Sequence, residues 1–500
     1  MAPLAFLSLL PLIFLLLLLL STTRKRKSNL PPSPPKLPII GNLHQVGPLP
    51  HRSLYALSKK HGPLMLLHLG QTPTLVISSP EMAQTVMRTH DQVFASRPPS
   101  IATDILLYGT KDVAFAPYGE HWRQERKLCA MHLLSTKKVQ SFRHAREEEV
   151  SFVIEKIRKA QEYSSGPINM SELLNTFAND VICRVVSGKF YRKEGRNDMF
   201  RELIEKSSAL ISGFHFEDFF PVLYWLDFIS GFASKAKKIA KKWDDVLEEV
   251  IKEHCNSNRL KDSMQESDFV DVLLSLQNDL HIEFGLTKEH TKAILQDMFA
   301  AGTDTSYITL EWAMTELMRH EGPMRKLQAE VRRIAGGKEM VKEEDLIEMS
   351  YLRAVIKEIL RLHPAAPLLL PRESMKDSQI DGYQVPKRTR VIINAWAINR
   401  HPKFWSAAEE FHPKRFMGSS VEYKGNDFQF IPFGAGRRVC LGISFAISTM
   451  ELMLANLIYH FDWELPYGVM KEEIDMTEAP GITVRKKEKI YLVPKLYVHV

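Results

Sequence analysis

The sequence predicts a mainly α-helical protein with small β-sheets, in which one large domain follows a short N-terminal segment. Four segments combine good helix formers with apolar residues at helical spacing: 143–162, 236–255, 287–320 and 351–362. Three shorter segments are rich in β-branched and apolar residues and predict strands: 64–69, 74–78 and 390–394. Strands and helices do not alternate as in a doubly wound sheet, and no repeat of fixed period occurs. A single α-rich domain therefore explains the pattern best.

The composition is typical of a folded protein and argues against a nucleic-acid-binding one. The chain has 500 residues, of which 45% are hydrophobic and 25% charged, so it can bury a large core. The net charge is +7, but four positive charges lie together at 24–27, and the rest of the chain lacks a basic stripe. The four cysteines, Cys129, Cys183, Cys255 and Cys440, are far apart in the chain, which argues against a disulfide framework or a zinc finger.

The N-terminal residues predict a membrane anchor. Residues 1–23 carry no charged side chain and are mostly apolar, so they can just span a bilayer as a helix. No positive residue precedes the apolar stretch and no small-x-small site follows it, so a retained anchor is favoured over a cleaved signal peptide. Residues 24–38 contain the basic cluster and a proline-rich, stiff hinge. By the positive-inside rule, the domain at 39–500 is expected in the cytosol.

Common nucleotide-binding and hydrolase motifs are absent. The stretch G-G-K-E at 336–339 lacks the first glycine and the hydroxyl of a P-loop, and G-A-G at 434–436 lacks the third glycine of a dinucleotide fingerprint. The segment 442–446 lacks the last glycine of a nucleophile elbow, and no H-E-x-x-H occurs. The sequence therefore gives no support to these nucleotide-binding and hydrolase chemistries.

Cys440 lies in a glycine-rich loop, P-F-G-A-G-R-R-V-C-L-G at 432–442, directly before an apolar helical stretch at 443–459. A helix N-terminus stabilises negative charge, so Cys440 is placed to exist as a thiolate, the form that binds soft metals. The glycines allow the backbone to approach a large flat ligand, and Arg438 can pair with an acidic group on it. From these residues alone, a buried structural cysteine in a glycine turn is equally compatible.

This loop resembles the haem loop of the cytochrome P-450 (haem-thiolate) monooxygenases. Their pattern F-x-x-G-x-R-x-C-x-G is highly specific, and it is filled here by Phe433, Gly436, Arg438, Cys440 and Gly442. The resemblance extends over nearly the whole chain and is strongest to the plant microsomal A-type group, clan seventy-one. Two positions depart from that group: Lys414 replaces the usual glutamate of P-E-R-F, and Leu441 replaces the usual proline after the cysteine. Neither change removes a side chain with a known chemical role.

The resemblance implies haem b as cofactor, with Cys440 as the axial ligand of the iron. It implies a set of cofactor-binding residues, several of which donate to the haem propionates: Trp122, Arg126, Arg372, Phe433, Gly436, Arg438 and Cys440, with Arg97 as a weaker further donor. It also implies a distal substrate pocket lined by Ile105, Phe115, Ala116, Asp297, Ala301, Leu370 and Ile482. Because most of these side chains are apolar, a small hydrophobic substrate is expected. Taken singly, each residue is also compatible with ordinary packing or a surface charge.

The long helix predicted at 287–320 has small residues and threonines at its middle, A-A-G-T-D-T-S at 300–306. Small side chains leave room for a ligand, and threonine hydroxyls that compete for helix carbonyls can open a local kink. A helix–helix contact through small residues would give the same composition. The resemblance implies the catalytic alternative, in which Thr305 and Asp304 relay protons during oxygen activation.

A structural charge network is implied near the helix predicted at 351–362. Glu358 and Arg361 are three residues apart, where side chains meet on one helix face, but the same E-x-x-R spacing occurs five times in the chain. The spacing alone therefore carries no weight. Among the glutamates of these five occurrences, Glu358 is the one nearest before Arg415 in the chain. Arg415 lies in a P-x-R-F context. The resemblance assigns Glu358, Arg361 and Arg415 to a buried network with a folding role.

These features together predict a membrane-anchored monooxygenase that oxidises a small hydrophobic plant metabolite, such as a terpenoid, a coumarin-like phenylpropanoid or an alkaloid. Electrons are expected from NADPH through a separate NADPH–cytochrome P-450 reductase, with cytochrome b5 as a further donor. The expected location is the endoplasmic reticulum membrane, with one span and a cytosolic catalytic domain. Two alternatives stay open: a haem-thiolate isomerase or dehydratase that needs no reductase, and a non-catalytic haem-binding membrane protein. The Asp304–Thr305 pair argues against the isomerase.

Overall fold

The computed structural model describes residues 29–163, 166–188, 196–256, 267–277 and 285–498. The predicted membrane anchor and the basic cluster lie outside these residues. Among the helices that are described, none combines the length and the apolar character needed to cross a membrane.

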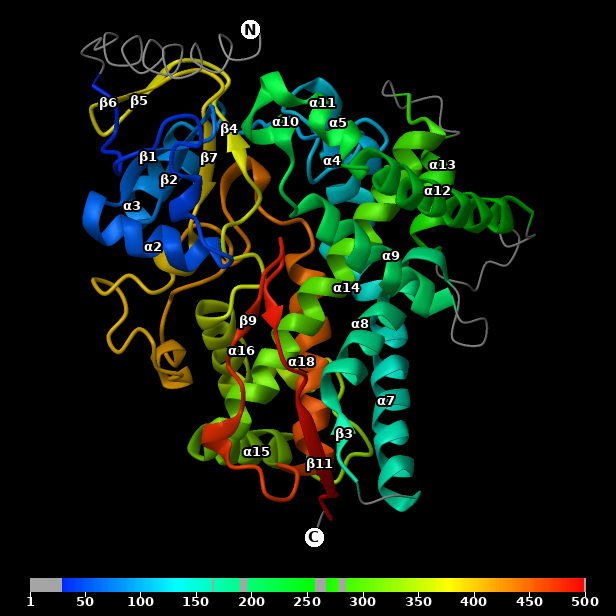
Figure 1. The fold of residues 1–500 in the computed structure, drawn as a ribbon. Coiled ribbons are helices and arrows are strands. Elements are labelled where there is room, and N and C mark those ends of the chain that lie inside the picture. The colour runs from blue at the N-terminus through cyan, green and yellow to red at the C-terminus, as the bar shows by residue number, and fades with distance from the viewer. Residues whose placement is uncertain (1–28, 164–165, 189–195, 257–266, 278–284, 499–500) are drawn as a thin grey trace, which may run out of the picture.

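Helices make up most of the described chain (Figure 1). In chain order they are α2 (Pro50–His61), α3 (Pro80–Gln84), α4 (Ile101–Leu106), α5 (Glu120–Leu128), α6 (Thr136–Ser141), α7 (Arg143–Tyr163), α8 (Met170–Ser187), α9 (Arg196–Ile211), α10 (Phe216–Phe219), α11 (Trp225–Ile229), α12 (Phe232–Asn256), α13 (Phe269–Gln277), α14 (Lys288–Arg319), α15 (Glu321–Ala335), α16 (Ser350–Leu362), α17 (Ala395–Ile398) and α18 (Ile443–His460). Two short 3₁₀ turns matter below: η8 (Pro413–Phe416) and η9 (Gly436–Arg438).

The strands are short and form small sheets. They are β1 (Leu64–Leu69), β2 (Thr72–Ile77), β3 (Ile168–Asn169), β4 (Arg372–Glu373), β5 (Ser378–Ile380), β6 (Tyr383–Val385), β7 (Arg390–Ile393), β8 (Phe461–Glu464), β9 (Glu478–Ala479), β10 (Arg485–Lys486) and β11 (Tyr491–Leu496). The largest sheet has the order β1-β2-β7-β4, and the others are β3-β11-β8, β5-β6 and β9-β10. β2 and β7 pair in parallel, with Thr74 opposite Arg390, and the other strand pairs are antiparallel.

The elements predicted from the sequence are confirmed, with ends shifted by a few residues. The four predicted helices correspond to α7, α12, α14 and α16, and the three predicted strands to β1, β2 and β7. The mainly α-helical class with small sheets is therefore confirmed.

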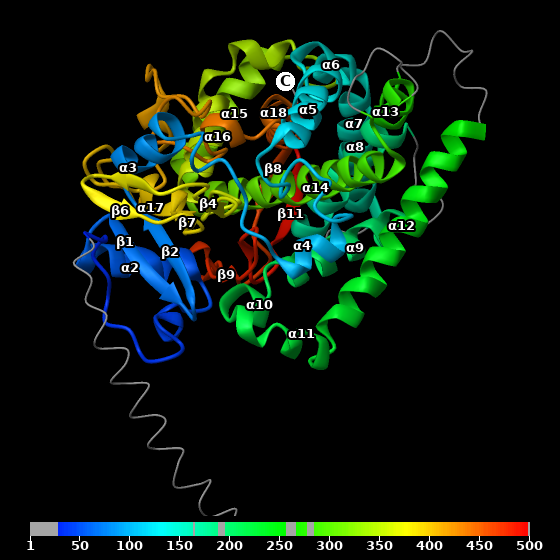
Figure 2. The same cartoon turned by 90° about the horizontal axis from the view of Figure 1, so that it is seen from above.

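α14 is the central helix of the molecule. Seen from above, it crosses the molecule between the sheet-rich side, with β1 and β2, and the helical side, with α12 (Figure 2). It packs against α8, α12, α16 and α18, and it has buried residues on all sides between Thr291 and Leu317. A helix that is buried along most of its length is held by its neighbours, because burial of its apolar side chains outweighs local propensity.

The loop before Cys440 joins two hydrophobic cores. Ile431 and Ala435 belong to the core beneath the β1-β2-β7-β4 sheet. The helix that follows, α18, contributes Met450 and Leu454 to the larger core among the helices. Both ends of the loop are therefore fixed by packing, which holds Cys440 at the junction.

Candidate functional site

The Cys440 loop is closed by its own backbone. The Cys440 N–H donates to the Phe433 carbonyl oxygen at 3.0 Å. Gly436 has a φ of +68°, and a Cβ there would lie 2.1 Å from the Met87 carbonyl oxygen, so only glycine fits. The next residue, Arg437, donates its backbone N–H to Asp91 Oδ2 at 2.8 Å. These contacts fix the loop against the segment that follows α3.

The Cys440 side chain is accessible and yet largely surrounded by protein. It is solvent-accessible, yet burial raises the pKa of its thiol, and the Gly442 N–H and Arg126 offset this only in part. The sequence predicts that the helix N-terminus stabilises a thiolate, but the effect of burial, which raises the pKa of the thiol, is larger. A cation bound to the sulfur is what would hold it as a thiolate.

The middle of α14 presents different residues to different neighbours. Ala301 is exposed although its helix is otherwise central. Gly302 faces α8, where a Cβ would lie 2.2 Å from Ile182 Cδ1, so this glycine serves close helix packing. The helix–helix contact considered from the sequence is therefore present at Gly302, whereas room for a ligand beside Ala301 stays a prediction.

Thr305 makes a local hydrogen bond in α14. Its hydroxyl donates to the Ala301 carbonyl at 2.8 Å, and the Thr309 hydroxyl donates to the Thr305 carbonyl at 2.9 Å. The helix nevertheless continues without interruption from Lys288 to Arg319. Each hydroxyl therefore adds a bond to a carbonyl without ending the helix.

Asp304 of α14 faces the segment between β9 and β10. The Thr483 hydroxyl donates to Asp304 Oδ2 at 3.4 Å. Burial raises the pKa of Asp304 to about 6, while Thr483 and Arg485 act in the opposite direction. Asp304 also lines a polar hollow of about 700 Å³ between α8, α9, α14 and the β9–β10 segment, together with Glu205 and Arg485. The carboxyl is thus within reach of surface water.

Four arginines from separate segments lie close enough to influence one another: Arg97, Arg126, Arg372 and Arg438. Burial and then Arg372 and Arg126 lower the pKa of Arg438 to about 9. Burial also lowers the pKa of Arg372 to about 10, although Asp91 opposes it from 3.5 Å. Burial, followed by Arg438 and Arg372, lowers the pKa of Arg97 as well.

The hydrogen-bond partners of these arginines are mostly neutral backbone carbonyls. Arg438 donates to the carbonyls of Ala95 (2.7 Å) and Ala116 (2.5 Å), Arg97 to that of Leu370 (2.8 Å), and Arg126 to that of Val439 (2.6 Å). Buried positive charges normally need negative partners. This cluster therefore fits a ligand with two carboxylates, as haem has in its propionates.

Trp122 belongs to the same cluster but uses its N–H elsewhere. The indole Nε1–H donates to the Val113 carbonyl at 3.0 Å. The Arg438 guanidinium lies 3.9 Å from the centre of the Trp122 ring, and that of Arg126 lies 5.5 Å away. Trp122 thus supports two of the arginines through its ring.

The predicted substrate-pocket residues come from five segments and differ in exposure. Ile105, Phe115, Leu370 and Ile482 are half-buried, and Ala301 is exposed. Ala116 is fully buried, and its carbonyl accepts from Arg438. Asp297 Oδ2 accepts the backbone N–H groups of Val113 (2.8 Å) and Ala114 (3.1 Å). Asp297 therefore ties α14 to the segment that contains Phe115.

Glu358, Arg361 and Arg415 lie together in one network. Arg361 binds Glu358 in a bidentate manner at 2.8 and 2.9 Å, and Arg415 Nε donates to Glu358 Oε1 at 3.0 Å. The His412 N–H donates to the same oxygen at 2.8 Å. Glu358 and Arg361 are completely buried. The network joins α16 to η8.

Several residues of the site have no signal in the sequence. Asp91, which contacts Arg372 and the backbone of Arg437, lies far from both in the chain. Asp112 accepts the Phe115 N–H at 2.7 Å and fixes the turn beside the arginine cluster. Such contacts depend on chain folding, so no local pattern could have indicated them.

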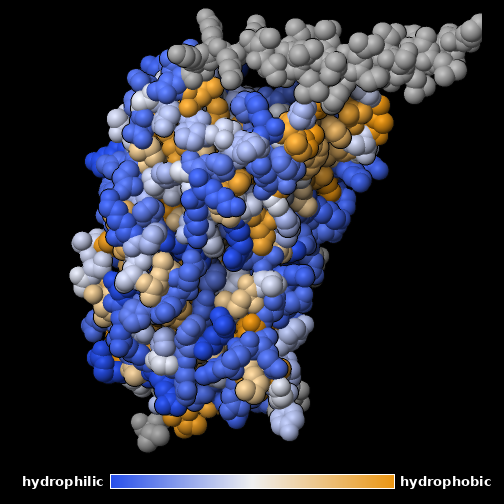
Figure 3. Space-filling model, turned by 60° about the vertical axis from the view of Figure 1, so that its left-hand side comes forward, coloured by the Kyte–Doolittle hydropathy of each residue, from blue (hydrophilic) through white to orange (hydrophobic). Residues whose placement is uncertain are grey.

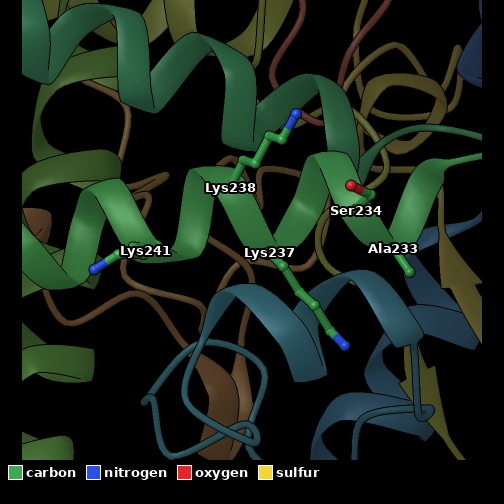
Figure 4. Close-up of a pocket in the computed structure, with 5 residues that line it drawn as sticks. All are labelled: Ala233, Ser234, Lys237, Lys238 and Lys241. Atoms are coloured by element: carbon green, nitrogen blue, oxygen red, sulfur yellow. The ribbon is translucent and has the colours of Figure 1, made fainter.

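A second hollow, of about 490 Å³, lies on the surface of α12. It is lined by Ala233, Ser234, Lys237, Lys238 and Lys241. Lys237 and Lys238 point away from each other (Figure 4). Because these charges do not converge on one point, this hollow does not form a binding site for a single anion.

Comparison with known proteins agrees with this geometry. Residues 31–493 match the family model described as Cytochrome P450. Indole-2-monooxygenase from Zea mays is 51% identical, over 93% of this chain and 88% of its own length. Phenylacetaldehyde oxime monooxygenase CYP71AN24 from Prunus mume is 48% identical, over 99% and 95%. Cytochrome P450 71A1 from Persea americana is 50% identical, over 92% of both chains. A structure of a zebra fish cytochrome P450 with abiraterone superposes with a TM-score of 0.76 at 26% identity, covering 91% of this chain and 100% of that one.

Proposed function

The chain belongs to the cytochrome P450 family, in the plant clan seventy-one, and on that premise we propose that it inserts one oxygen atom into a small aromatic plant metabolite at the endoplasmic reticulum membrane. It is a monooxygenase that uses haem b and receives electrons from NADPH through a reductase. The observation that carries the proposal is an accessible Cys440 in the protein interior beside a buried arginine cluster.

The residues present fit haem. Cys440 would bind the iron, and Arg97, Arg126, Arg372 and Arg438 would hold the propionates. Haem with a thiolate ligand supplies the electron donation that favours O–O cleavage. The protein's own contribution is to position the cofactor, exclude water and deliver protons.

Proton delivery is assigned to Asp304 and Thr305. Asp304 has a pKa of about 6 because of burial, so it can both hold and release a proton near neutral pH. It lines the polar hollow on one side of α14. Thr305 donates its hydroxyl to Ala301, the exposed residue of the helix centre. A proton entering through the hollow would pass from Asp304 to the Thr305 hydroxyl, through water.

An aromatic substrate agrees with the side chains and with the names of relatives. Ile105, Phe115, Leu370 and Ile482 are apolar and half-buried, and they offer few polar contacts. Two relatives are named for indole and for phenylacetaldehyde oxime, which both contain an aromatic ring. Among the classes expected from the sequence, phenylpropanoids and indole-type alkaloids are therefore favoured over terpenoids.

Membrane binding is supported by exposed hydrophobic side chains on two neighbouring segments: Leu37, Ile39 and Ile40, and Phe214, Val222, Tyr224, Trp225 and Ile229. The Gly70 N–H donates to the Ile40 carbonyl at 3.2 Å, and the Gln71 N–H to the Phe219 carbonyl at 2.8 Å. Both segments therefore adjoin the β1–β2 turn. Figure 3 shows hydrophobic patches at the upper end of the surface. Such a surface is typical of a membrane contact.

The test uses microsomes that contain the full chain and a plant reductase. A panel of indoles, phenylpropanoids, terpenoids and alkaloids is screened for spectral shifts on binding, and the hits are incubated with NADPH and ¹⁸O₂. We expect an aromatic hit whose product contains one ¹⁸O atom and forms only with the reductase present. Turnover without the reductase would support the isomerase or dehydratase instead. Binding and turnover of terpenoids alone would contradict the aromatic substrate class.

A further inference from the structure

A cluster of two histidines and a glutamate joins α5 to the first turn of α14. His121 and Glu125 lie one helical turn apart on α5, and His290 lies on α14. One ligand atom from each residue lies within 4.8 Å of the other two. His121 Nε2 is 3.2 Å from Glu125 Oε2, and the centroids of the two imidazole rings are 4.8 Å apart. The mechanism proposed above uses none of these three residues.

Glu125 is the unusual member of the cluster. It is completely buried, and neither of its carboxylate oxygens accepts a hydrogen bond from the described residues. Burial and the nearby Asp112 raise the pKa of Glu125 to about 8. Asp112 and Glu125 in turn contribute to the raised pKa of Asp297, for which burial is the main cause. A buried carboxyl group without hydrogen bonds is costly, and a cation beside it would lower the cost.

Both histidines of the cluster are partly desolvated. Burial, followed by the charge of Lys111, lowers the pKa of His121, and burial together with His121 lowers the pKa of His290 to about 4. His290 Nδ1 accepts the Thr287 backbone N–H at 3.0 Å in the capping box of α14. Binding of a metal at Nε2 would move the ring proton to Nδ1, where the Thr287 hydroxyl oxygen, 2.9 Å away, would accept it.

We propose that His121, Glu125 and His290 form a site for a divalent transition metal such as Zn²⁺. Two imidazoles and one carboxylate are a known zinc ligand set, with a fourth position left for water. Tetrahedral ligands around zinc lie about 3.3 Å apart, given bond lengths of ~2.0 Å. The 38% exposed His121 side chain can turn to close the remaining distance. The bound ion would hold α5, which carries Trp122 and Arg126, against α14.

A second cluster, of His254, Asp268 and Asp271, differs from the proposed metal site because its polar groups bond to one another. His254 Nδ1 lies 2.7 Å from the Val250 carbonyl and Nε2 lies 2.9 Å from Asp268 Oδ2. Asp268 and Asp271 each accept the other's backbone N–H, at 2.9 and 3.2 Å. These groups already satisfy one another as the cap of α13, so this cluster needs no metal.

The test measures Zn²⁺ binding by the full-length haem-loaded enzyme, using equilibrium dialysis and metal analysis, and the melting temperature with and without Zn²⁺. The variants are His121→Ala, Glu125→Gln and, as a matched control, His144→Ala. His144 forms the same i,i+4 pair with Glu148 on α7, at 2.7 Å, but the described part of the chain offers it no third ligand.

We expect the wild type and His144→Ala to bind one equivalent of Zn²⁺ and to melt at a higher temperature with it. His121→Ala and Glu125→Gln should bind at least ~10-fold more weakly, because even changes in residues that only orient ligands cost that much. His121 is near the surface, so its variant should fold normally. The proposal is wrong if the wild type binds no equivalent of Zn²⁺, if both variants bind like the wild type, or if binding is lost in Asp268→Asn instead.

Discussion

Removal of Arg415 should destabilise the protein less than removal of the Glu358 charge. In Arg415→Ala, Glu358 loses one donor at 3.0 Å but keeps the bidentate Arg361 and the His412 N–H. The other bonds of Arg415 go to the carbonyls of Ser406 and Ala407, which water can reach and solvate. The expected cost is therefore that of one charged hydrogen bond, about 1.5–3 kcal/mol.

Glu358→Gln has a larger expected effect because it leaves two arginines without their negative partner. Arg361 is completely buried, and the Arg415 side chain is 9% exposed. Breaking a buried ion pair on one side costs about 3–5 kcal/mol. Loss of Arg415 alone does not leave Glu358 without a positive partner, because Arg361 still neutralises the glutamate.

The assay is the haem content per polypeptide together with the melting temperature of the purified protein. Lys414→Glu is the control, since Lys414 is the exposed neighbour of Arg415 in η8 and should behave like the wild type. We expect the order Lys414→Glu, Arg415→Ala, Glu358→Gln for increasing loss of stability and haem. Equal losses in Arg415→Ala and Glu358→Gln, or a loss in Lys414→Glu, would refute the reasoning.

Further predictions concern the cofactor and the proton path. Cys440→Ala should lose the red-shifted Soret band of the reduced carbon monoxide complex, because only a thiolate ligand produces it; the same loss from Cys129→Ala, with Cys440 intact, would contradict the assignment. Thr305→Ala should still consume NADPH but form less product per NADPH. The reduction should be at most the ~10²–10⁴-fold that general acid–base catalysis contributes, and hydrogen peroxide release measures the electrons that do not reach the product. Burial raises the pKa of Asp304 to about 6, so the Asp304 carboxyl ionises around that pH. The product yield per NADPH of the wild type should therefore change near pH 6, whereas Asp304→Asn should show no such change. Gly436→Ala should lose more haem than Gly434→Ala. Both glycines have positive φ, but only at Gly436 would a Cβ meet a carbonyl oxygen, at 2.1 Å. Equal haem loss in the two variants would show that backbone strain alone, and not the close contact, determines the effect.

The chain segments with strong local patterns were predictable. The helices α7, α12, α14 and α16 follow from apolar spacing within one continuous segment, and β1, β2 and β7 from runs of β-branched and apolar residues. The Cys440 loop was recognisable because its residues are contiguous and their spacing is constrained by one tight turn. The threonines of α14 were also found, but their hydroxyls bond to carbonyls without interrupting the helix.

The sequence by itself determined the helical class, the Cys440 loop and the choice of family, because each depends on residues close together in the chain. Only the tertiary structure decided that Arg97, Arg126, Arg372 and Arg438 form one cluster, in which Arg126 is half-buried and the other three are buried. The same holds for Asp91 beside Arg437 and for His290 beside His121. Such pairs form when distant segments pack together, and the burial that raises the pKa of Asp304 or Glu125 exists only after packing. Desolvation and long-range charge pairing are properties of the folded core, so they leave no pattern in neighbouring residues.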